Sequence, residues 1–146
     1  MDKKESPSQL QLTTLLDHYQ NGRYSDAETL ALSITQEFPN HQFGWKVLGV
    51  ILKQQGRIDE SLVANQKSVQ LSFQDAEAHS NLGNTLKELG RFEEAEASYI
   101  QAIALKPDFP EAHSNLGVTL QELGRLNEAE TSYTQAIALK ADFPEA

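Results

Sequence analysis

The stretch AHSNLG stands at residues 78–83 and again at residues 112–117, so its two copies begin 34 residues apart. The identity continues on both sides of the stretch. When residues 76–109 are aligned with residues 110–143, 26 of the 34 positions are identical. A fixed period of this length predicts a solenoid of stacked repeats.

The same period extends into the N-terminal half, where the copies have diverged. Glycines stand in register at four positions: Gly22, Gly56, Gly90 and Gly124. We therefore divide the chain into four repeats, at about 8–41, 42–75, 76–109 and 110–143. We expect residues 1–7 to form a disordered N-terminal tail and residues 144–146 to begin a truncated fifth repeat.

Each repeat contains two stretches with helical spacing. In the third, Leu82 and Leu86 belong to the first stretch, Gly90 interrupts it, and Phe92 begins the second. Gly90 suits a left-handed helix end. Gly83 stands in mid-helix, where glycine costs about 1 kcal/mol relative to alanine, and we attribute it to close approach of the partner helix. The pattern predicts an all-α chain in which each repeat is an antiparallel helix pair.

The composition excludes several classes of protein. The hydrophobic content of 39% and the charged content of 23% are those of an ordinary globular protein. No apolar run approaches the ~20 residues that a membrane span needs, so we expect no membrane partner. The net charge is −9 and no cluster of Lys and Arg is present, which argues against nucleic-acid binding. A cytoplasmic location fits a chain without cysteine.

The histidines do not indicate a catalytic or metal site. His79 and His113 recur with the period on the packed side of their helices, and no acidic ligand recurs with them. We therefore expect both to be packing residues. The sequence predicts no catalytic residue, no metal and no cofactor, and the chain is not expected to be an enzyme.

One family shares this pattern of positions. The third repeat carries it at Leu82, Gly83, Gly90, Phe92, Ala95, Tyr99, Ala102 and Pro107, which resembles the tetratricopeptide-repeat (TPR) signature. Residues 80–88 and 106–117 are most similar to the repeats of the O-linked N-acetylglucosamine transferase, and nothing resembles its catalytic domain. The resemblance implies a right-handed α-solenoid that binds a protein or peptide.

Helix geometry then selects the candidate ligand-binding residues, because a helix turns about 100° per residue. The free sides of successive first helices line one concave surface in a stacked solenoid. We expect a ligand to contact these residues of that surface: Asn81, Asn115, Asn84, Ser80, Ser114, Lys87, Gln121, Glu77, Glu111, Lys46 and Lys53.

Asn81 and Asn115 are the preferred candidates, since they stand one repeat apart. A carboxamide both donates and accepts hydrogen bonds, so it can match an extended backbone whatever its side chains. In the transferase that the chain resembles, asparagines at this place form such a ladder. The alternative is that both are ordinary solvated residues on an exposed helix face.

Three functions remain open at this point. The first is a scaffold that binds a partner segment in the groove, and the second is the recognition arm of a larger enzyme such as a glycosyltransferase. The third is a self-associating scaffold, in which residues 126–146 of two copies meet to form a homodimer. The residues expected at that contact are Ala129, Tyr133, Ala136 and Ile137.

Overall fold

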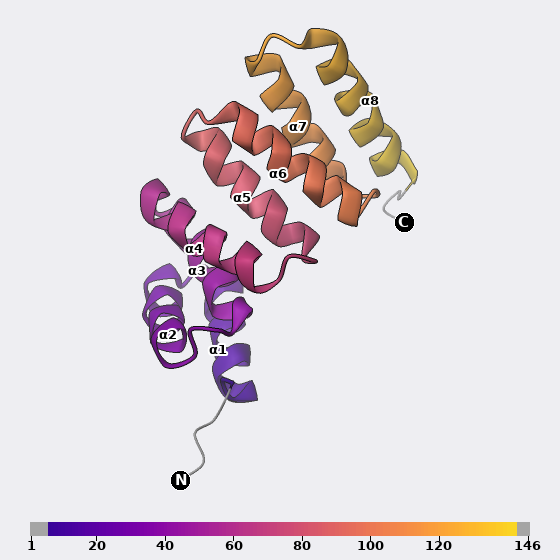
Figure 1. The fold of residues 1–146 in the computed structure, drawn as a ribbon. Coiled ribbons are helices and arrows are strands. Elements are labelled where there is room, and N and C mark those ends of the chain that lie inside the picture. Colours follow the sequence, from indigo (N-terminus) through magenta and orange to yellow (C-terminus); the bar gives the residue numbers. More distant parts are fainter. Residues whose placement is uncertain (1–5, 143–146) are drawn as a thin grey trace. The chain divides into compact units, whose positions relative to one another are not determined.

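The structure, a computed structural model, describes residues 6–142, and its chain divides into two compact units, Met1–Ser72 and Phe73–Ala146. Each unit contains two antiparallel helix pairs (Figure 1). The helices are α1 (Gln9–Gln20), α2 (Tyr24–Glu37), α3 (Gln42–Gln54) and α4 (Ile58–Leu71) in the first unit, and α5 (Ala76–Glu88), α6 (Phe92–Leu105), α7 (Pro110–Glu122) and α8 (Leu126–Asp142) in the second. No strand occurs among residues 6–142, and the predicted all-α class is confirmed.

Two expectations concern the ends of the chain. Residues 1–5 of the expected tail lie outside the described residues, and so do residues 144–146, the expected start of a fifth repeat. Pro7, which the expected tail includes, is buried. Ser8 then begins α1 with a capping box, in which its hydroxyl accepts from the Gln11 amide and the Gln11 side chain accepts from the Ser8 amide.

The turn inside each helix pair requires a left-handed glycine. At Gly90 the backbone φ is +74°, as the sequence predicts. The Gly90 N–H donates to the Lys87 carbonyl and the Arg91 N–H donates to the Leu86 carbonyl, both at 2.9 Å. This pair of bonds is the Schellman motif, which satisfies carbonyls at the end of the first helix. An added Cβ would meet no atom within 4 Å, so the requirement is conformational rather than steric.

The two helices of a pair meet where a tyrosine ring lies over a glycine. A Cβ added to Gly83 would stand 2.8 Å from Cε1 of Tyr99, and one added to Gly117 would stand 2.8 Å from Cε1 of Tyr133. Contacts this short do not occur for real Cβ atoms, so the ring occupies the space that any larger residue would need. The close approach inferred for Gly83 is therefore confirmed.

Ring N–H groups hold the loops that connect one repeat to the next. The three pairs are Trp45 Nε1 with the Pro39 carbonyl at 2.9 Å, His79 Nε2 with the Phe73 carbonyl at 2.8 Å, and His113 Nε2 with the Pro107 carbonyl at 3.0 Å. A carbonyl only accepts, so Nε2 of each histidine carries the proton. His79 and His113, which we expected to be packing residues, thus anchor these loops.

Within each unit an arginine joins the second helices of neighbouring repeats. Arg57 lies 2.7 Å from Glu28, and Arg125 lies 2.7 Å from Glu96. Each arginine also pairs with the glutamate three residues later, in the helix that begins directly after the arginine. All these partners are partly exposed, so each pair contributes little to the stability of the fold. They link one helix pair to the next within each unit.

Three residues expected on open surfaces are buried instead. Ser80 was expected on the free side of α5, but its exposed fraction is 4%. Ala129 and Ala136 were expected to face a further repeat, but they are 3% and 4% exposed. These expectations are wrong because a helical wheel gives the direction of a side chain on its helix. It does not show how far the neighbouring helices cover that side chain. Of the four residues expected at the self-association contact, Ile137 is exposed at 69% and Tyr133 is half-buried.

Replacing Gly83 with leucine should lower the free energy of unfolding by a few kcal/mol, because the side chain would displace the Tyr99 ring. Thermal and urea denaturation measure the change. Glu88→Leu is the control, since Glu88 is an exposed residue on the same helix. Equal stability of Gly83→Leu and the parent would contradict the packing described for this helix pair.

Replacing Gly90 with alanine should destabilise the protein by about 1–2 kcal/mol, the cost of a left-handed conformation for a residue with a Cβ. Asn tolerates this conformation better, so Gly90→Asn should cost less. Urea denaturation of both variants tests the order. If alanine proves as stable as glycine, the turn does not depend on the positive φ.

Candidate peptide-binding face

The candidate face lies in the C-terminal unit, where the first helices α5 and α7 contact one another. The structure places the sequence-predicted residues of these helices at different depths. Glu77, Glu111 and Gln121 are exposed, whereas Asn81, Asn84, Lys87, Ser114 and Asn115 are half-buried. Lys46 and Lys53 belong to α3 in the N-terminal unit and are half-buried there.

Three of these side chains, Asn84, Lys87 and Asn115, form one hydrogen-bonded group with Tyr99 of α6, and we call this group the amide cluster. The Tyr99 hydroxyl donates to Asn84 Oδ1 at 2.6 Å, and Asn115 Nδ2 donates to the same oxygen at 3.2 Å. Lys87 Nζ donates to Asn115 Oδ1 at 3.2 Å. The cluster therefore joins α5, α6 and α7, and it connects the two repeats of the unit.

The hydrogen bonds of the cluster fix the direction of both amides. Two donors meet at Asn84 Oδ1, so the amide nitrogen of Asn84 must point away from them. Among the described residues, no acceptor contacts this nitrogen, and it keeps two N–H groups. Asn115 Nδ2 uses one of its two N–H groups on Asn84. The cluster thus presents donors, which suit the carbonyl oxygens of a ligand.

The tyrosine explains why Asn84 stands at this place. Tyr99 is fully buried, and its burial raises the pKa of the phenol above the ordinary value of 10.0. A buried hydroxyl without an acceptor costs about 1–3 kcal/mol, so Tyr99 needs the Asn84 oxygen. The oxygen of Asn84 consequently accepts the hydrogen bond of Tyr99, whereas its amide nitrogen remains available to a ligand.

The fourth repeat satisfies the same tyrosine in another way. Val118 and Gln121 replace Asn84 and Lys87 at the equivalent positions. Tyr133 there donates to Gln121 Oε1 at 3.0 Å. The hydrogen bonds of Asn84 and Lys87 therefore have no counterpart in the fourth repeat, because these two positions are among the eight at which the repeats differ. Sequence reasoning did not find the cluster, although this difference between the copies was its signal.

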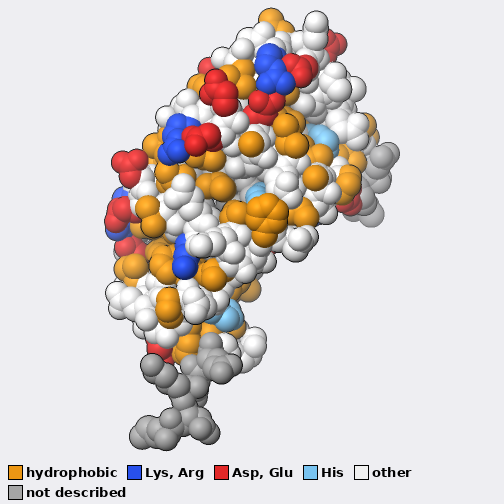
Figure 2. All heavy atoms as spheres, viewed as in Figure 1, with side chains coloured by type: hydrophobic (Ala, Val, Ile, Leu, Met, Phe, Trp, Pro, Cys, Tyr) orange, Lys and Arg blue, Asp and Glu red, His pale blue; other side chains and the backbone are white. Residues whose placement is uncertain are grey.

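The charges on α5 and α7 are mostly negative. The two helices carry four glutamates, Glu77, Glu88, Glu111 and Glu122, and one basic residue, Lys87. On the second-helix side the arginines are already paired, and hydrogen bonds from Arg125 hold the pKa of Glu128 below its ordinary value. Figure 2 shows this neutralisation at the C-terminal end of the view, where blue side chains touch red ones. The first-helix face therefore favours a neutral or basic ligand.

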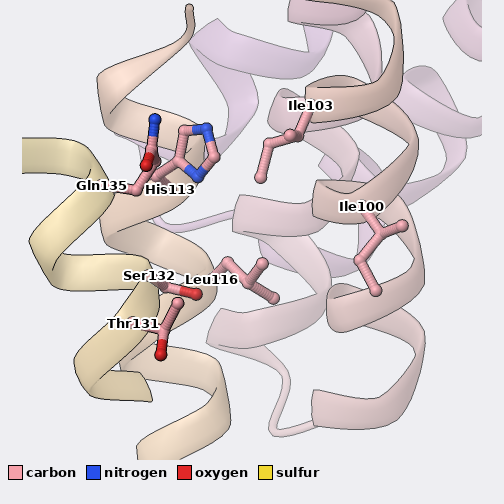
Figure 3. Close-up of a pocket in the computed structure, with 7 residues that line it drawn as sticks. All are labelled: Ile100, Ile103, His113, Leu116, Thr131, Ser132 and Gln135. Carbon is pink, nitrogen blue, oxygen red and sulfur yellow. The ribbon is translucent and has the colours of Figure 1, made fainter. Parts of the chain in front are cut away.

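A second depression lies between the second helices α6 and α8, with α7 as its floor. The depression has a volume of 360 Å³, and Figure 3 shows the side chains from these three helices that line it. They are Ile100, Ile103, His113, Leu116, Thr131, Ser132 and Gln135. No sequence prediction concerned this depression.

Other kinds of site have no support in the described residues. No three His, Asp or Glu side chains between residues 6 and 142 are grouped in a way that could hold a metal ion. None of the helices described combines the length and the apolar character that a bilayer crossing requires.

Stacked helix pairs with polar side chains on their first helices define the class of helical-repeat scaffolds. Two family models match the C-terminal unit: "TPR repeat" matches residues 83–124, and "Tetratricopeptide repeat" matches residues 110–143. These matches, together with the fold, support membership in the TPR family. TPR repeats indicate a scaffold for protein–protein interaction.

Solved structures of MamA share the fold. One crystal structure of MamA has a TM-score of 0.84 at 20% identity, over 90% of this chain and 77% of that one. The structure of MamA from Desulfovibrio magneticus RS-1 has a TM-score of 0.83 at 19% sequence identity, over 92% of this chain and 76% of that one. The structure of MamA MSR-1 has a TM-score of 0.78 at 22% sequence identity, over 92% of this chain and 77% of that one. No curated protein matches this sequence significantly.

The amide cluster predicts a measurable coupling between Asn84 and Tyr99. Asn84→Ala should destabilise the protein by about 1–3 kcal/mol, because it leaves a buried hydroxyl without its acceptor. Adding Tyr99→Phe removes that hydroxyl, so the double variant should be more stable than Asn84→Ala alone. Urea denaturation of the complete double-mutant cycle measures the coupling. Strictly additive effects would show that the hydrogen bond contributes nothing.

Proposed function

We propose that the chain is a protein-interaction scaffold whose C-terminal unit binds an extended segment of a partner protein along α5 and α7. The observation that supports this most directly is the amide cluster. It holds the N–H groups of Asn84 and Asn115 on two successive repeats in a fixed direction. Groups that are already oriented lose little side-chain entropy when a ligand binds.

The chemistry of the face favours particular features in the ligand. Amide donors pair with backbone carbonyls, which every extended segment offers at regular intervals. Lys87 is the one lysine or arginine on α5 and α7, and the same two helices carry four glutamates. A segment that presents carbonyls to the amides and neutral or basic side chains to the glutamates complements this surface.

The chain itself supplies a conservative test, because the fourth repeat shows what the third can tolerate. In the double variant Asn84→Val, Lys87→Gln, the two positions take the residues that stand at Val118 and Gln121. The new glutamine should accept from Tyr99 as Gln121 accepts from Tyr133, so stability is expected to stay close to that of the parent. The amide donors of Asn84 and the charge of Lys87 are lost.

The measurement uses peptides selected on the full chain from a displayed random-peptide library. We expect the double variant to bind the selected peptides about tenfold more weakly, since it lacks a charged group and an oriented amide. Val63→Ala is the control, because Val63 is exposed on α4 in the other unit. Unchanged affinity of the double variant for every selected peptide would refute this use of the face.

The finer alternatives from the sequence remain proposals. The similarity of residues 80–88 and 106–117 to transferase repeats supports a role as the recognition arm of a larger enzyme, and the same face would then hold the substrate protein. The exposed Ile137 on α8 supports contact between two copies through residues 126–146, of which 143–146 lie outside the described residues. Both alternatives keep the chain a protein-binding scaffold.

A further inference from the structure

The depression between α6 and α8 is longer than the part that Figure 3 shows. A second depression of 300 Å³ shares four residues with it, namely Ile100, Leu116, Thr131 and Ser132. This second part continues toward Arg125, at the turn before α8. We call the two parts together the outer trough. Its floor on α7 does not include the residues of the amide cluster, so the two surfaces are separate.

The outer trough exists because α6 and α8, in their described parts, pack against α7 rather than against each other. The apolar side chains between them are therefore covered from one side only. Ile100 keeps 51% of its surface exposed, although isoleucine is among the residue types most often buried. Leu116 and Leu120 form a buried apolar floor beside it. A helix fits such a place, because a row of its side chains packs into the groove between two others.

The two walls of the outer trough differ in polarity. Ile100 and Ile103 stand on the α6 wall, whereas hydroxyl and amide side chains stand on the α8 wall (Figure 3). The Thr131 hydroxyl donates to the Asn127 carbonyl at 3.2 Å, so its oxygen can still accept a hydrogen bond. An occupant thus meets apolar groups on one flank and hydrogen-bonding groups on the other. An amphipathic helix presents this combination.

The charge at the Arg125 end of the trough is negative. Arg125 pairs with both Glu96 and Glu128, and all three residues line the trough. Two carboxylates share one guanidinium, so one negative charge is in excess. The helices on either side add to it, since α6 contains three glutamates and no lysine or arginine, and α8 contains three acidic residues and one lysine. A basic occupant complements this charge.

A second copy of the chain does not offer a helix of this kind. Among the helices within residues 6–142, only α3 carries more lysine and arginine than aspartate and glutamate. The apolar face of α3 is already used, because α3 packs against α2 and α4 and its residues Val47, Leu48, Ile51 and Leu52 are buried. The occupant that fits the trough therefore belongs to another protein.

We propose that the outer trough binds a basic amphipathic helix of a partner protein. The helix places a row of aliphatic side chains against Ile100 and Leu116, and lysines or arginines near Glu96 and Glu128. This surface is formed by other residues than the face of α5 and α7, and its ligand is helical rather than extended. The inference rests on the proposed function only in treating the chain as a protein-binding scaffold.

The test uses labelled synthetic peptides and the full chain, with fluorescence anisotropy as the measurement. The probe is a helical peptide with leucines along one face and lysines on the other. Three control peptides replace the leucines with alanines, replace the lysines with glutamates, or scramble the order of the same residues. We expect the probe to bind about tenfold more tightly than each control, because only the probe combines an apolar row with the matching charge.

Variants of the chain locate the binding. Ile100→Thr introduces the residue that stands at the equivalent position of the fourth repeat, Thr134, and should weaken binding of the probe about tenfold. Ile137→Thr is the matched control, since Ile137 is 69% exposed on α8 and does not line the trough. Glu96→Gln keeps an acceptor for Arg125 but removes one charge. It should weaken binding about threefold at low salt and reduce the salt dependence of the affinity.

Several results would overturn the proposal. They are equal binding of the probe and the scrambled or glutamate peptide, and parental affinity of Ile100→Thr or Glu96→Gln. Circular dichroism checks that each variant keeps its helices, and if Ile100→Thr does not, Glu96→Gln alone decides the outcome. Sedimentation in which the parent dimerises and Ile100→Thr is monomeric would assign the trough to a second copy instead.

The outcome is independent of the face on α5 and α7. The double variant Asn84→Val, Lys87→Gln changes no residue of the outer trough, so it should bind the helical probe with parental affinity. Ile100→Thr should likewise leave the affinity for the peptides selected on the full chain unchanged. Failure of this proposal is therefore distinguishable from failure of the proposed function.

Discussion

The close approach of two helices at a glycine is the constraint on which the rest of the C-terminal unit depends. The Tyr99 ring lies on Gly83 and the Tyr133 ring lies on Gly117, with no space for a Cβ between them. This contact sets the distance between the helices of each pair and buries the tyrosine completely in the third repeat. The N-terminal unit makes the approach with a smaller residue, since Asn65 lies against Gly49.

Burial of the tyrosine has a consequence for the functional surface. Its hydroxyl needs an acceptor, and Asn84 supplies one with its oxygen. The amide nitrogen of Asn84 is thereby turned away, and Asn115 and Lys87 join the same group across the repeat boundary. A requirement of packing therefore orients the amide donors that we propose as ligand-binding groups.

The two units use one scaffold to present different chemistry. In both units the turn inside each helix pair is made by a glycine with positive φ. Ring N–H groups of tryptophan or histidine anchor the loops between repeats in both units. The side chains on the first helices differ: leucine and phenylalanine with lysines in one unit, amides with glutamates in the other. A repeat fold permits this because the residues that pack and the residues that face a ligand occupy separate sides of each helix.

The sequence by itself determined the period, the all-α class, the helix pairs and the left-handed turn at Gly90, because these follow from local backbone preferences and from spacing along the chain. It also indicated the close approach at Gly83. Only the tertiary structure decided how deep each residue lies, and Ser80, Ala129 and Ala136 proved to be buried. Only the structure could bring together Lys87 and Asn115, or Asn84 and Asn115, which are separated by 28 and 31 residues. The physical reason is that a helical wheel defines direction within one helix, whereas burial and long-range hydrogen bonds depend on the neighbouring helices.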